Sequence, residues 1–346
     1  MNITNTLIES SSPQTALLKV KQLGKQFSVK LGFLKSGKVS AVEDVSFEIR
    51  EGETLGIVGE SGCGKSTTAR LLLRLIEPDT GDIVFDGKDL KAIKPEDQKQ
   101  VRRNMQMVFQ DPYSSLNPRM SIQDNIGFPL KVNGYSKQEI RDTTLSLLEQ
   151  VGLPKSYANY LPSQLSGGQL QRVNIARALA LKPKVVICDE AVSALDKSIQ
   201  AQVLNLLKDL QEQLQLTYLF ISHDLNVVEY VSDRVLVMYM GQVVESCSAE
   251  ELYQNPLHPY TKALLASIPK MEFEDHQSED AVEYGDGEMP SPLNPPSGCR
   301  FRTRCPIALD ICAQEHPGFR YPVAEHAVAC HLYQTDQPSI PTAALG

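Results

Sequence analysis

The chain alternates short apolar runs with segments of helical periodicity over most of its length. The apolar runs are as long as β-strands, and because both of their faces are apolar they are typical of strands buried in a parallel sheet. The segments between them have the spacing of amphipathic helices. This alternation indicates an α/β fold in which helices cover both faces of the sheet. The strand-like runs are 54–59, 81–87, 105–109, 184–189, 217–222 and 234–241, and the clearest helical segments are 66–76 and 199–214.

Two further stretches differ from this alternation. Residues 17–53 alternate apolar and polar positions on either side of a loop that contains glycine and lysine, which predicts strands with one exposed face. Residues 121–180 are polar and rich in helical patterns, and 136–152 has both the capping signals and the periodicity of an amphipathic helix. We therefore expect a strand-rich segment near the N-terminus and a helical insertion at about 121–180.

Composition marks the boundaries of the main domain. Eight acidic residues lie between Glu272 and Glu288, where apolar periodicity is almost absent, so we interpret 271–291 as a solvated acidic linker. A surface loop within one continuous domain is the alternative. The other expected segments are a disordered N-terminal tail (1–15), the main domain (16–270) and a C-terminal cysteine-rich region (292–346).

Charge and apolar content argue against some classes of function. The chain has 34 basic and 42 acidic residues, and its net charge of −8 disfavours nucleic acid as a partner. The longest apolar runs have the length of strands, whereas a membrane span needs roughly 20 residues. The first residues lack the basic and apolar regions of a signal peptide. We therefore expect a soluble chain, in which any membrane role comes from a partner.

A glycine-rich segment, GESGCGKST (59–67), joins a strand-like run to a helical one and fits the pattern G-x-x-x-x-G-K-[ST]. Its glycines let the backbone curl so that successive N–H groups point at phosphate oxygens. Lys65 supplies positive charge to the β- and γ-phosphates, and the hydroxyl of Ser66 can ligate Mg²⁺. The segment therefore predicts a nucleotide site. Its binding residues are Gly59, Ser61, Gly62, Cys63, Gly64, Lys65, Ser66 and Thr67.

A second strand-like run ends in two acids, in the sequence VVICDE (185–190). Asp189 stands at the end of the run, where its carboxylate can hold Mg²⁺ through water. Glu190 follows and is placed to polarise the water that attacks the γ-phosphate. An apolar strand that ends in acids is common by itself, so this assignment depends on the phosphate-binding loop in the same chain.

The segment LSGGQLQRV (165–173) contains a second turn that can bind an anion. Ser166, Gly167, Gly168 and Gln169 lie where a predicted helix begins, and free N–H groups at a helix start attract phosphate. One nucleotide rarely needs two such turns, so we infer that this turn contacts the γ-phosphate held by another subunit. Together the three segments resemble the Walker A, Walker B and signature motifs of the ATP-binding subunits of ABC transporters.

The resemblance implies roles for further residues. Gln110 resembles the Q-loop glutamine, which contacts Mg²⁺ and the attacking water, and Asp196 in SALD resembles the D-loop aspartate that reaches across a dimer. His223 resembles the switch histidine, which contacts the γ-phosphate. Phe27 lies at the usual place of the aromatic residue that stacks on adenine, with Phe33 as the alternative. No catalytic position departs from the pattern, so the resemblance implies an enzyme that hydrolyses ATP.

Over nearly the whole chain, including 108–120 and 257–269, the sequence resembles the ATPase subunits of oligopeptide/dipeptide permeases. This implies a P-loop NTPase fold of the ABC type, with a RecA-like parallel sheet core, an antiparallel β subdomain and a helical insertion. It also implies ATP-driven dimerisation with a second ATPase subunit, usually a paralogue, which powers the import of dipeptides or oligopeptides through two transmembrane permease subunits. A periplasmic or surface binding protein would deliver the substrate, and this subunit would lie peripherally on the cytoplasmic face of the inner (plasma) membrane. Glutathione or nickel as the cargo, and a soluble regulatory ATPase, are the alternatives.

Four of the seven cysteines lie in the C-terminal region, with the spacing C-x5-C-x6-C-x17-C. Disulfides are disfavoured in a reducing compartment, and a short region with few large apolar residues needs another means of stabilisation. A site made of four thiolates would supply one. Structural zinc sites usually contain tight C-x2–4-C pairs, which are missing here. The resemblance favours a [4Fe–4S] cluster, with Zn²⁺ or four free thiols as alternatives, and the expected ligands are Cys299, Cys305, Cys312 and Cys330.

Overall fold

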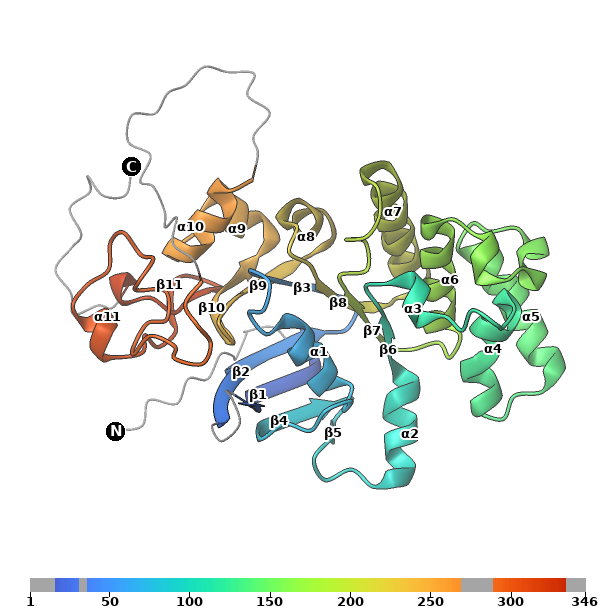
Figure 1. Ribbon diagram of the computed structural model, residues 1–346, viewed down its shortest axis with the longest axis horizontal. Coiled ribbons are helices and arrows are strands. Elements are labelled where there is room, and N and C mark those ends of the chain that lie inside the picture. Colours follow the sequence, from blue (N-terminus) through green and yellow to red (C-terminus); the bar gives the residue numbers. More distant parts are fainter. Residues whose placement is uncertain (1–15, 31–35, 269–288, 334–346) are drawn as a thin grey trace, which may run out of the picture.

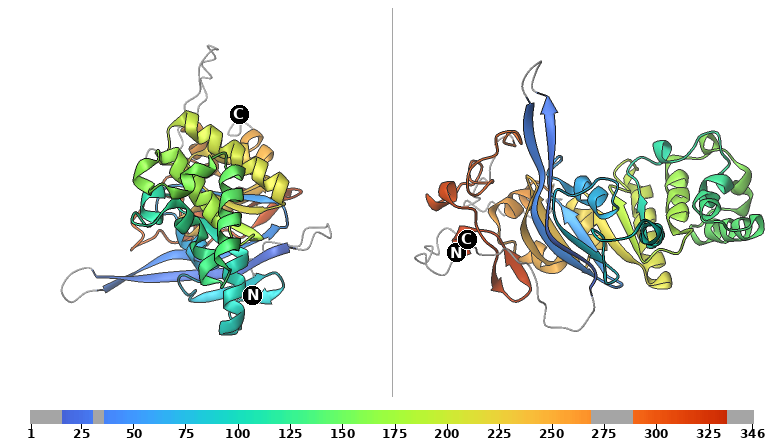
Figure 2. Two further views of the ribbon diagram at one scale, coloured as in Figure 1. Left: turned by 90° about the vertical axis from the view of Figure 1, so that its right-hand side faces the viewer. Right: turned by 90° about the horizontal axis from the view of Figure 1, so that it is seen from below.

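The computed structural model describes residues 16–30, 36–268 and 289–333. An eight-stranded mixed sheet runs through the molecule, and a smaller antiparallel sheet lies beside it (Figure 1). The helical insertion and the cysteine-rich region lie at opposite ends of the long axis, as the view from below also shows (Figure 2). No helix among the described residues is long and apolar enough to cross a membrane.

Five parallel strands form the centre of the large sheet, in the order β9-β3-β8-β7-β6. Successive residues point to hydrophobic clusters on opposite faces: in β7, Val185 and Ile187 join one cluster, whereas Val186 and Cys188 join the other. Because both faces are covered, these strands have the nearly continuous apolar sequence that predicted them. The strands are β3 (Thr54–Val58), β6 (Met105–Val108), β7 (Val185–Asp189), β8 (Thr217–Ile221) and β9 (Arg234–Tyr239).

The smaller sheet is antiparallel, with the strand order β2-β1-β4-β5. Its buried residues join the cluster that also contains one face of the central sheet and the helix α1. The prediction of strands within 17–53 is therefore confirmed, and this sheet packs over the helix that follows the glycine-rich segment. The elements are β1 (Ala16–Lys30), β2 (Ser36–Arg50), β4 (Thr80–Phe85), β5 (Lys88–Asp89) and α1 (Lys65–Leu72).

Helices cover the other face of the central sheet and build the insertion. The three main helices of the insertion each begin at a serine N-cap, and in α5 and α6 a Glu or Gln three residues later completes a capping box. These helices are α4 (Ile122–Val132), α5 (Lys137–Gln150) and α6 (Gly167–Leu179). The others are α2 (Pro95–Asn104), α3 (Pro112–Ser115), η1 (Lys155–Asn159), η2 (Pro162–Gln164), α7 (Lys197–Leu214), α8 (Leu225–Val231), α9 (Ala249–Gln254) and α10 (Pro259–Ala266).

The cysteine-rich region continues the central sheet. Its strand β12 (His326–Val328) pairs antiparallel with β10 (Gln242–Ser248), and β11 (Arg320–Val323) pairs with β12 at the sheet edge. α11 (Ile311–Gln314) and η3 (His331–Tyr333) complete the region. The tail 1–15 and most of the linker 271–291 lie outside the described residues. The described part of the cysteine-rich region is joined to the main sheet, so the structure does not support a separate domain there. The separate cysteine-rich domain stays a prediction.

Candidate nucleotide site and cysteine cluster

The phosphate-binding loop connects the end of β3 to the start of α1. Gly59 and Gly64 have φ angles of 150° and 109°, a region that residues with a side chain rarely adopt. A Cβ atom at Gly59 would overlap the carbonyl oxygen of Met238, and one at Gly64 would overlap that of Ala41. Both positions therefore require glycine. Gly64 is also the N-cap of α1, so the free N–H groups of the helix start open toward the loop.

Lys65 is buried within this loop. Its ammonium donates hydrogen bonds to the carbonyl oxygens of Gly59 (2.6 Å) and Glu60 (2.9 Å), and it lies 3.7 Å from Sγ of Cys63. Burial raises the pKa of the Cys63 thiol, so this thiol is neutral. It therefore does not offset the positive charge of Lys65. The loop thus presents a positive charge where phosphates bind. The remaining positions, Ser61, Gly62 and Thr67, are exposed or half-buried.

Ser66 and Asp189 meet between α1 and β7. The Ser66 hydroxyl donates to Oδ1 of Asp189 at 2.8 Å. Burial raises the pKa of Asp189, and the hydrogen bond from Ser66 acts in the opposite direction. A hydroxyl and a carboxylate side by side are the oxygen donors that Mg²⁺ prefers. The two residues therefore fit a magnesium ion, whose charge would offset that of the nucleotide phosphates.

Gln110, Glu190 and His223 converge beyond the ends of three neighbouring strands, β6, β7 and β8. Gln110 Nε2 donates to Oε2 of Glu190 at 2.7 Å, and Nδ1 of His223 lies 3.3 Å from Oε1 of the same carboxylate. Glu190 has a backbone φ of 48°, and residues other than glycine with positive φ are concentrated at functional sites. A carboxylate held between an amide and an imidazole can orient and polarise water.

The signature turn lies at the start of α6. The Ser166 side chain accepts from Gln169 N (3.4 Å), and the Gln169 side chain accepts from Ser166 N (2.9 Å). At Gly168 a Cβ atom would lie 2.5 Å from Ile199, so α6 packs closely on α7, whereas Gly167 has more room. In the described part of the chain, the hydrogen bonds of Ser166 and Gln169 stay within this turn and reach Tyr157.

Comparison with known proteins identifies the family. A profile of the ABC transporter family matches residues 42–193, and a profile of the oligopeptide/dipeptide transporter C-terminal region matches residues 244–312. The oligopeptide transport ATP-binding protein AppF of Bacillus subtilis is 50% identical over 328 residues, which cover 94% of this chain and 99% of that protein. The chain belongs to the oligopeptide/dipeptide branch of the ABC transporter family. The oligopeptide transport ATP-binding protein OppF of Salmonella typhimurium is 48% identical over 336 residues, covering 94% and 98% of the two chains.

Solved ABC structures have the same core as this ABC protein. The cassette MJ0796, in a dimeric post-hydrolysis state bound to ADP and Pi, matches with a TM-score of 0.60 and 31% identity over 67% of this chain and 98% of that chain. CbiO1 from Clostridium perfringens, part of the cbiONQ complex, matches with a TM-score of 0.61 and 28% identity over 69% and 91%. The predicted ABC nucleotide-binding fold is confirmed, and the chain is an ABC-type ATPase.

Two residues of this ABC ATPase that were assigned by resemblance stand apart from the contacts above. Asp196 is the exposed N-cap residue of α7, and its side chain makes no capping hydrogen bond. Phe27 lies on β1 and is 39% exposed, with the ammonium of Lys25 5.8 Å from its ring centre. The alternative, Phe33, lies outside the described residues. The roles of all residues assigned by resemblance stay predictions.

The four C-terminal cysteines of the ABC protein lie together as free thiols. Cys299 N donates to the carbonyl oxygen of Cys312 at 2.8 Å, which closes the loop that carries the first three. Burial, together with the smaller effect of the other three cysteines, raises the pKa of Cys330 to about 12. Burial, together with the smaller effect of Cys299 and Cys312, raises the pKa of Cys305 to about 11. The four sulfur atoms are therefore electrostatic neighbours.

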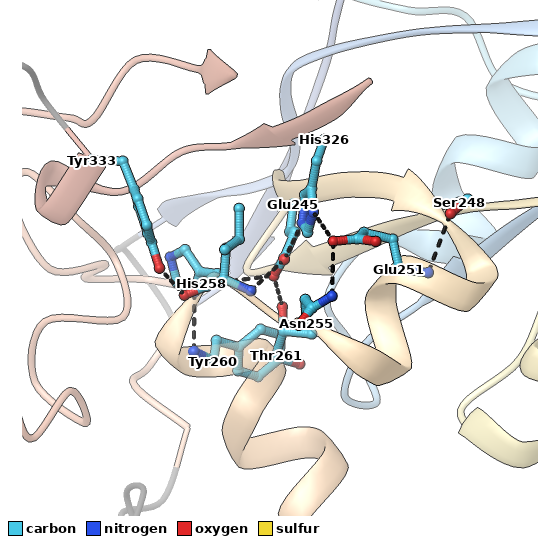
Figure 3. A network of polar contacts seen from close by, with 10 residues as sticks. Glu245, Ser248, Glu251, Asn255, His258, Tyr260, Thr261, His326 and Tyr333 are labelled. Carbon is cyan, nitrogen blue, oxygen red and sulfur yellow. Dashed lines mark hydrogen bonds and ion pairs between the residues drawn. The ribbon is translucent and has the colours of Figure 1, made fainter. Parts of the chain in front are cut away.

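A buried carboxylate ties this region to the sheet (Figure 3). Glu245 on β10 accepts hydrogen bonds from the N–H groups of Leu257 (2.7 Å) and His258 (2.9 Å) and from the Thr261 hydroxyl, while His326 Nε2 on β12 lies 2.7 Å from its Oε1. Burial alone would raise the pKa of Glu245, but the hydrogen bonds from His326, Thr261 and the backbone hold it below its usual value. The carboxylate is therefore ionised and connects β10, the start of α10 and β12.

Among the described residues, one group of potential metal ligands has its ligand atoms within 4.8 Å of one another: Glu245, Cys247 and His326. The hydrogen bonds of Glu245 already occupy both of its oxygen atoms, so we interpret this group as structural. The four C-terminal cysteines do not form such a tight group. In a tetrahedral zinc site the sulfur atoms stand about 3.8 Å apart, which follows from Zn–S bonds of about 2.3 Å.

The sequence did not predict the contact that Glu60, a residue of the phosphate-binding loop, makes with Tyr260 and Arg304. Glu60 occupies a variable position of the loop motif, so its type carries no signal. Tyr260 lies about 200 positions from Glu60 along the chain. The only feature of the sequence that draws attention to Arg304 is its position directly before Cys305.

Proposed function

We propose that this ABC ATPase powers the import of dipeptides or oligopeptides. The observation that carries the proposal is the match over 94% of the chain, at 48 to 50% identity, to oligopeptide transport ATP-binding proteins. The oligopeptide/dipeptide C-terminal profile supports it independently, because that profile covers 244–312, beyond the ABC core. A soluble regulatory ATPase, or an importer of glutathione or nickel, would have to carry the same C-terminal region.

The geometry suggests how the chain's own residues act on ATP. Lys65 and the loop N–H groups hold the phosphates, and Ser66 and Asp189 hold Mg²⁺. Glu190 orients and polarises the attacking water, assisted by Gln110 and His223. Catalysis of this kind is mainly positioning and electrostatic stabilisation. Mg²⁺, when bound, offsets the negative charge that develops on the phosphates.

The second half of each site comes from a partner in this proposal. Ser166 and the N–H groups at the start of α6 would contact the γ-phosphate held by a second ATPase subunit, with Asp196 reaching across the same interface. The dimeric state of the MJ0796 cassette supports this arrangement. The proposed partners are a paralogous ATPase subunit, two transmembrane permease subunits and, indirectly, a periplasmic or surface substrate-binding protein. The subunit would then lie peripherally on the cytoplasmic face of the inner membrane.

The helical insertion and the loop after Gln110 are the proposed contact with the permease. Large apolar side chains are exposed there, namely Tyr113 (60%), Phe128 (53%) and Val132 (60%). Single exposed apolar residues are ordinary, but a group on one subdomain is typical of a protein interface. Membrane extraction with a tag on this subunit should co-purify two multi-span proteins. If the subunit is purified from native membranes without them, the transporter assignment is wrong.

Uptake measurements test the cargo. A strain that lacks this gene should lose accumulation of labelled di- and oligopeptides and regain it with the wild-type gene, but not with Glu190→Gln. Excess unlabelled peptide should compete with uptake, whereas glutathione and Ni²⁺ should not. Uptake of labelled peptide at the wild-type rate in the deletion strain would refute peptide import by this subunit.

We also propose that the four cysteines hold a [4Fe–4S] cluster. The four free thiols are neighbours, and their sulfur atoms are not gathered as closely as a single zinc ion requires. A cubane cluster has its irons at separate corners, which suits ligands farther apart. Anaerobically purified protein should be brown, with broad absorbance near about 400 nm that is lost in Cys305→Ser. Colourless wild-type protein with one equivalent of zinc would establish the alternative.

We also propose a division of the chain into segments. It consists of an ATPase domain (16–270), an acidic linker (271–291) and a cysteine-rich region (292–346) behind an N-terminal tail (1–15). Limited proteolysis should cut first within 271–291. Because β12 pairs with β10, the two fragments should stay together after the cut, until a denaturant separates them.

A further inference from the structure

One residue of the phosphate-binding loop is held by the C-terminal part of the chain. The N–H group of Glu60 donates to the hydroxyl of Tyr260 on α10 at 2.9 Å. Its carboxylate oxygens accept two hydrogen bonds from the guanidinium of Arg304, at 2.9 and 3.0 Å. Its carbonyl oxygen accepts from Lys65, the lysine that faces the phosphates. The same residue thus contacts the catalytic loop, α10 and the cysteine-rich region.

The residues that hold Glu60 are themselves firmly packed. Tyr260 is fully buried, and its ring lies 4.5 Å from that of Tyr239 and 5.5 Å from that of Phe301. The guanidinium of Arg304 lies 5.7 Å from the ring centre of Phe301 and 5.9 Å from that of Tyr239. Aromatic and cation–π contacts of this kind restrict side-chain motion. Arg304 is therefore presented to the loop in one orientation.

The fold of the cysteine loop determines where Arg304 lies. Phe301 follows Cys299 by two residues, and Arg304 directly precedes Cys305. A second arginine of the same loop, Arg300, forms an ion pair with Glu43 on β2 and donates to the carbonyl oxygen of Met240. These contacts fix the cysteine loop against the nucleotide-binding core. Loss of order at the cysteines would therefore release Arg304 from Glu60.

Electrostatics gives this contact a consequence for ATP. Glu60 places a carboxylate on the loop that must bind the negative phosphates, and an unpaired carboxylate there would repel them. The guanidinium neutralises it, because Nη1 of Arg304 donates to both carboxylate oxygens, and hydrogen bonds between charged groups are among the stronger ones. The side chains of Arg304 and Glu60 are 12% and 27% exposed, so the pair is only partly screened by solvent.

We propose that Arg304 and Tyr260 are positioning residues of the ATP site, which hold and neutralise Glu60 so that the folded cysteine-rich region sets the affinity of the loop for ATP. Neither residue touches the nucleotide in this proposal. It extends the ATPase activity of the chain and depends neither on the cargo nor on which metal the cysteines hold. A failed peptide-uptake experiment would leave it intact, because it concerns the binding of nucleotide to the purified subunit.

The test is a double-mutant cycle in the full-length protein, with Mg·ATP binding measured by titration calorimetry. Arg304→Gln should raise Kd by roughly five- to tenfold, a coupling typical of neighbouring groups. Glu60→Gln alone should lower Kd, because Arg304 then faces the phosphates unneutralised. Combining the two substitutions should return Kd to near the wild-type value. In steady-state hydrolysis, Arg304→Gln should raise KM with little change in kcat.

Three further variants separate positioning from simple loss of structure. Arg302→Gln is the matched control, because the described hydrogen bonds of Arg302 go to Ser297 within the cysteine-rich region, so its Kd should stay at the wild-type value. Arg304→Lys should recover part of the affinity. Tyr260→Phe keeps the buried ring but removes the acceptor of the Glu60 N–H, and should raise Kd about threefold. The proposal is overturned if Arg304→Gln binds ATP with the wild-type Kd, or if adding Glu60→Gln to Arg304→Gln does not restore that Kd. It is also overturned if Arg302→Gln loses as much affinity as Arg304→Gln.

Discussion

The buried carboxylate of Glu245 should be the main polar contact that holds the cysteine-rich region on the sheet. Substitution by Gln keeps the size and shape of the side chain but replaces one oxygen with an NH₂ group. In the native protein each oxygen accepts from one backbone N–H, either that of Leu257 or that of His258. His326 and Thr261 can turn or exchange a proton to suit an amide, but a backbone N–H cannot. Either amide orientation therefore leaves one buried N–H group facing another donor.

The magnitude follows from these contacts. A buried donor without a partner costs about 1–3 kcal/mol, and each hydrogen bond to a charged acceptor contributes about 1.5–3 kcal/mol. Losing one partner and the charge of the carboxylate together should lower the free energy of unfolding by roughly 3 kcal/mol, close to the range for breaking a buried ion pair. At about 2–4 °C per kcal/mol, the melting temperature should fall by about 6–12 °C.

Differential scanning calorimetry of wild-type, Glu245→Gln and Glu251→Gln measures the effect. Glu251 is the matched control: its carboxylate is partly exposed and lies 3.8 Å from Nδ1 of His326, so the loss of its charge should shift the melting temperature by about 2 °C or less. Protease should also remove the region 289–333 faster in Glu245→Gln. Equal melting temperatures for Glu245→Gln and wild-type protein would refute the role assigned to this carboxylate.

Three other predictions follow from the same geometry. Glu190→Gln should retain ATP through gel filtration and lose at least about a hundredfold in the rate of hydrolysis; rapid turnover would remove Glu190 from its role. Ser166→Ala should slow hydrolysis by the dimer but leave ATP binding by the monomer unchanged, and equal loss in both would contradict a shared site. Burial lowers the pKa of His258 to about 4, so the unfolded chain takes up a proton first as the pH falls, and stability should decline between about pH 6.5 and 4 by on the order of 3 kcal/mol. His258→Asn keeps a cap for Tyr260 N and should remove that part of the slope in urea titrations at each pH, whereas an unchanged slope would contradict the assignment.

The sequence was sufficient wherever the physical cause is local. The glycine positions of the phosphate-binding loop follow from backbone geometry, and they occur in the structure with the left-handed φ angles that exclude side chains. The central strands carry apolar residues on both faces, so their pattern predicts burial without knowledge of their neighbours. The helix α5 has Ser136 as its N-cap, with the capping box that the sequence indicated.

Prediction failed where a residue depends on partners far along the chain. The strand β10 contains Glu245, Ser246 and Cys247, a mixed pattern that indicates neither a buried strand nor an exposed one. Glu245 is buried because His326, 81 residues later, and the start of α10 both supply hydrogen bonds. The residues of the Glu60 contact lie about 200 and 244 positions apart. No local pattern encodes such a pairing.

The order of the strands explains how the chain brings its last part to the phosphate-binding loop. β3 ends at that loop, and only β9 and β10 lie between it and β12 of the cysteine-rich region. The pairing of β12 with β10 restricts the position of the cysteine loop, and in that position Arg304 contacts Glu60. The sheet edge would otherwise expose unpaired backbone groups, so the pairing satisfies them as well. Two requirements, a covered edge and a neutralised Glu60, thus favour the same docked position, which is why loss of Arg304 or of the β10–β12 pairing should weaken both ATP binding and the attachment of the region.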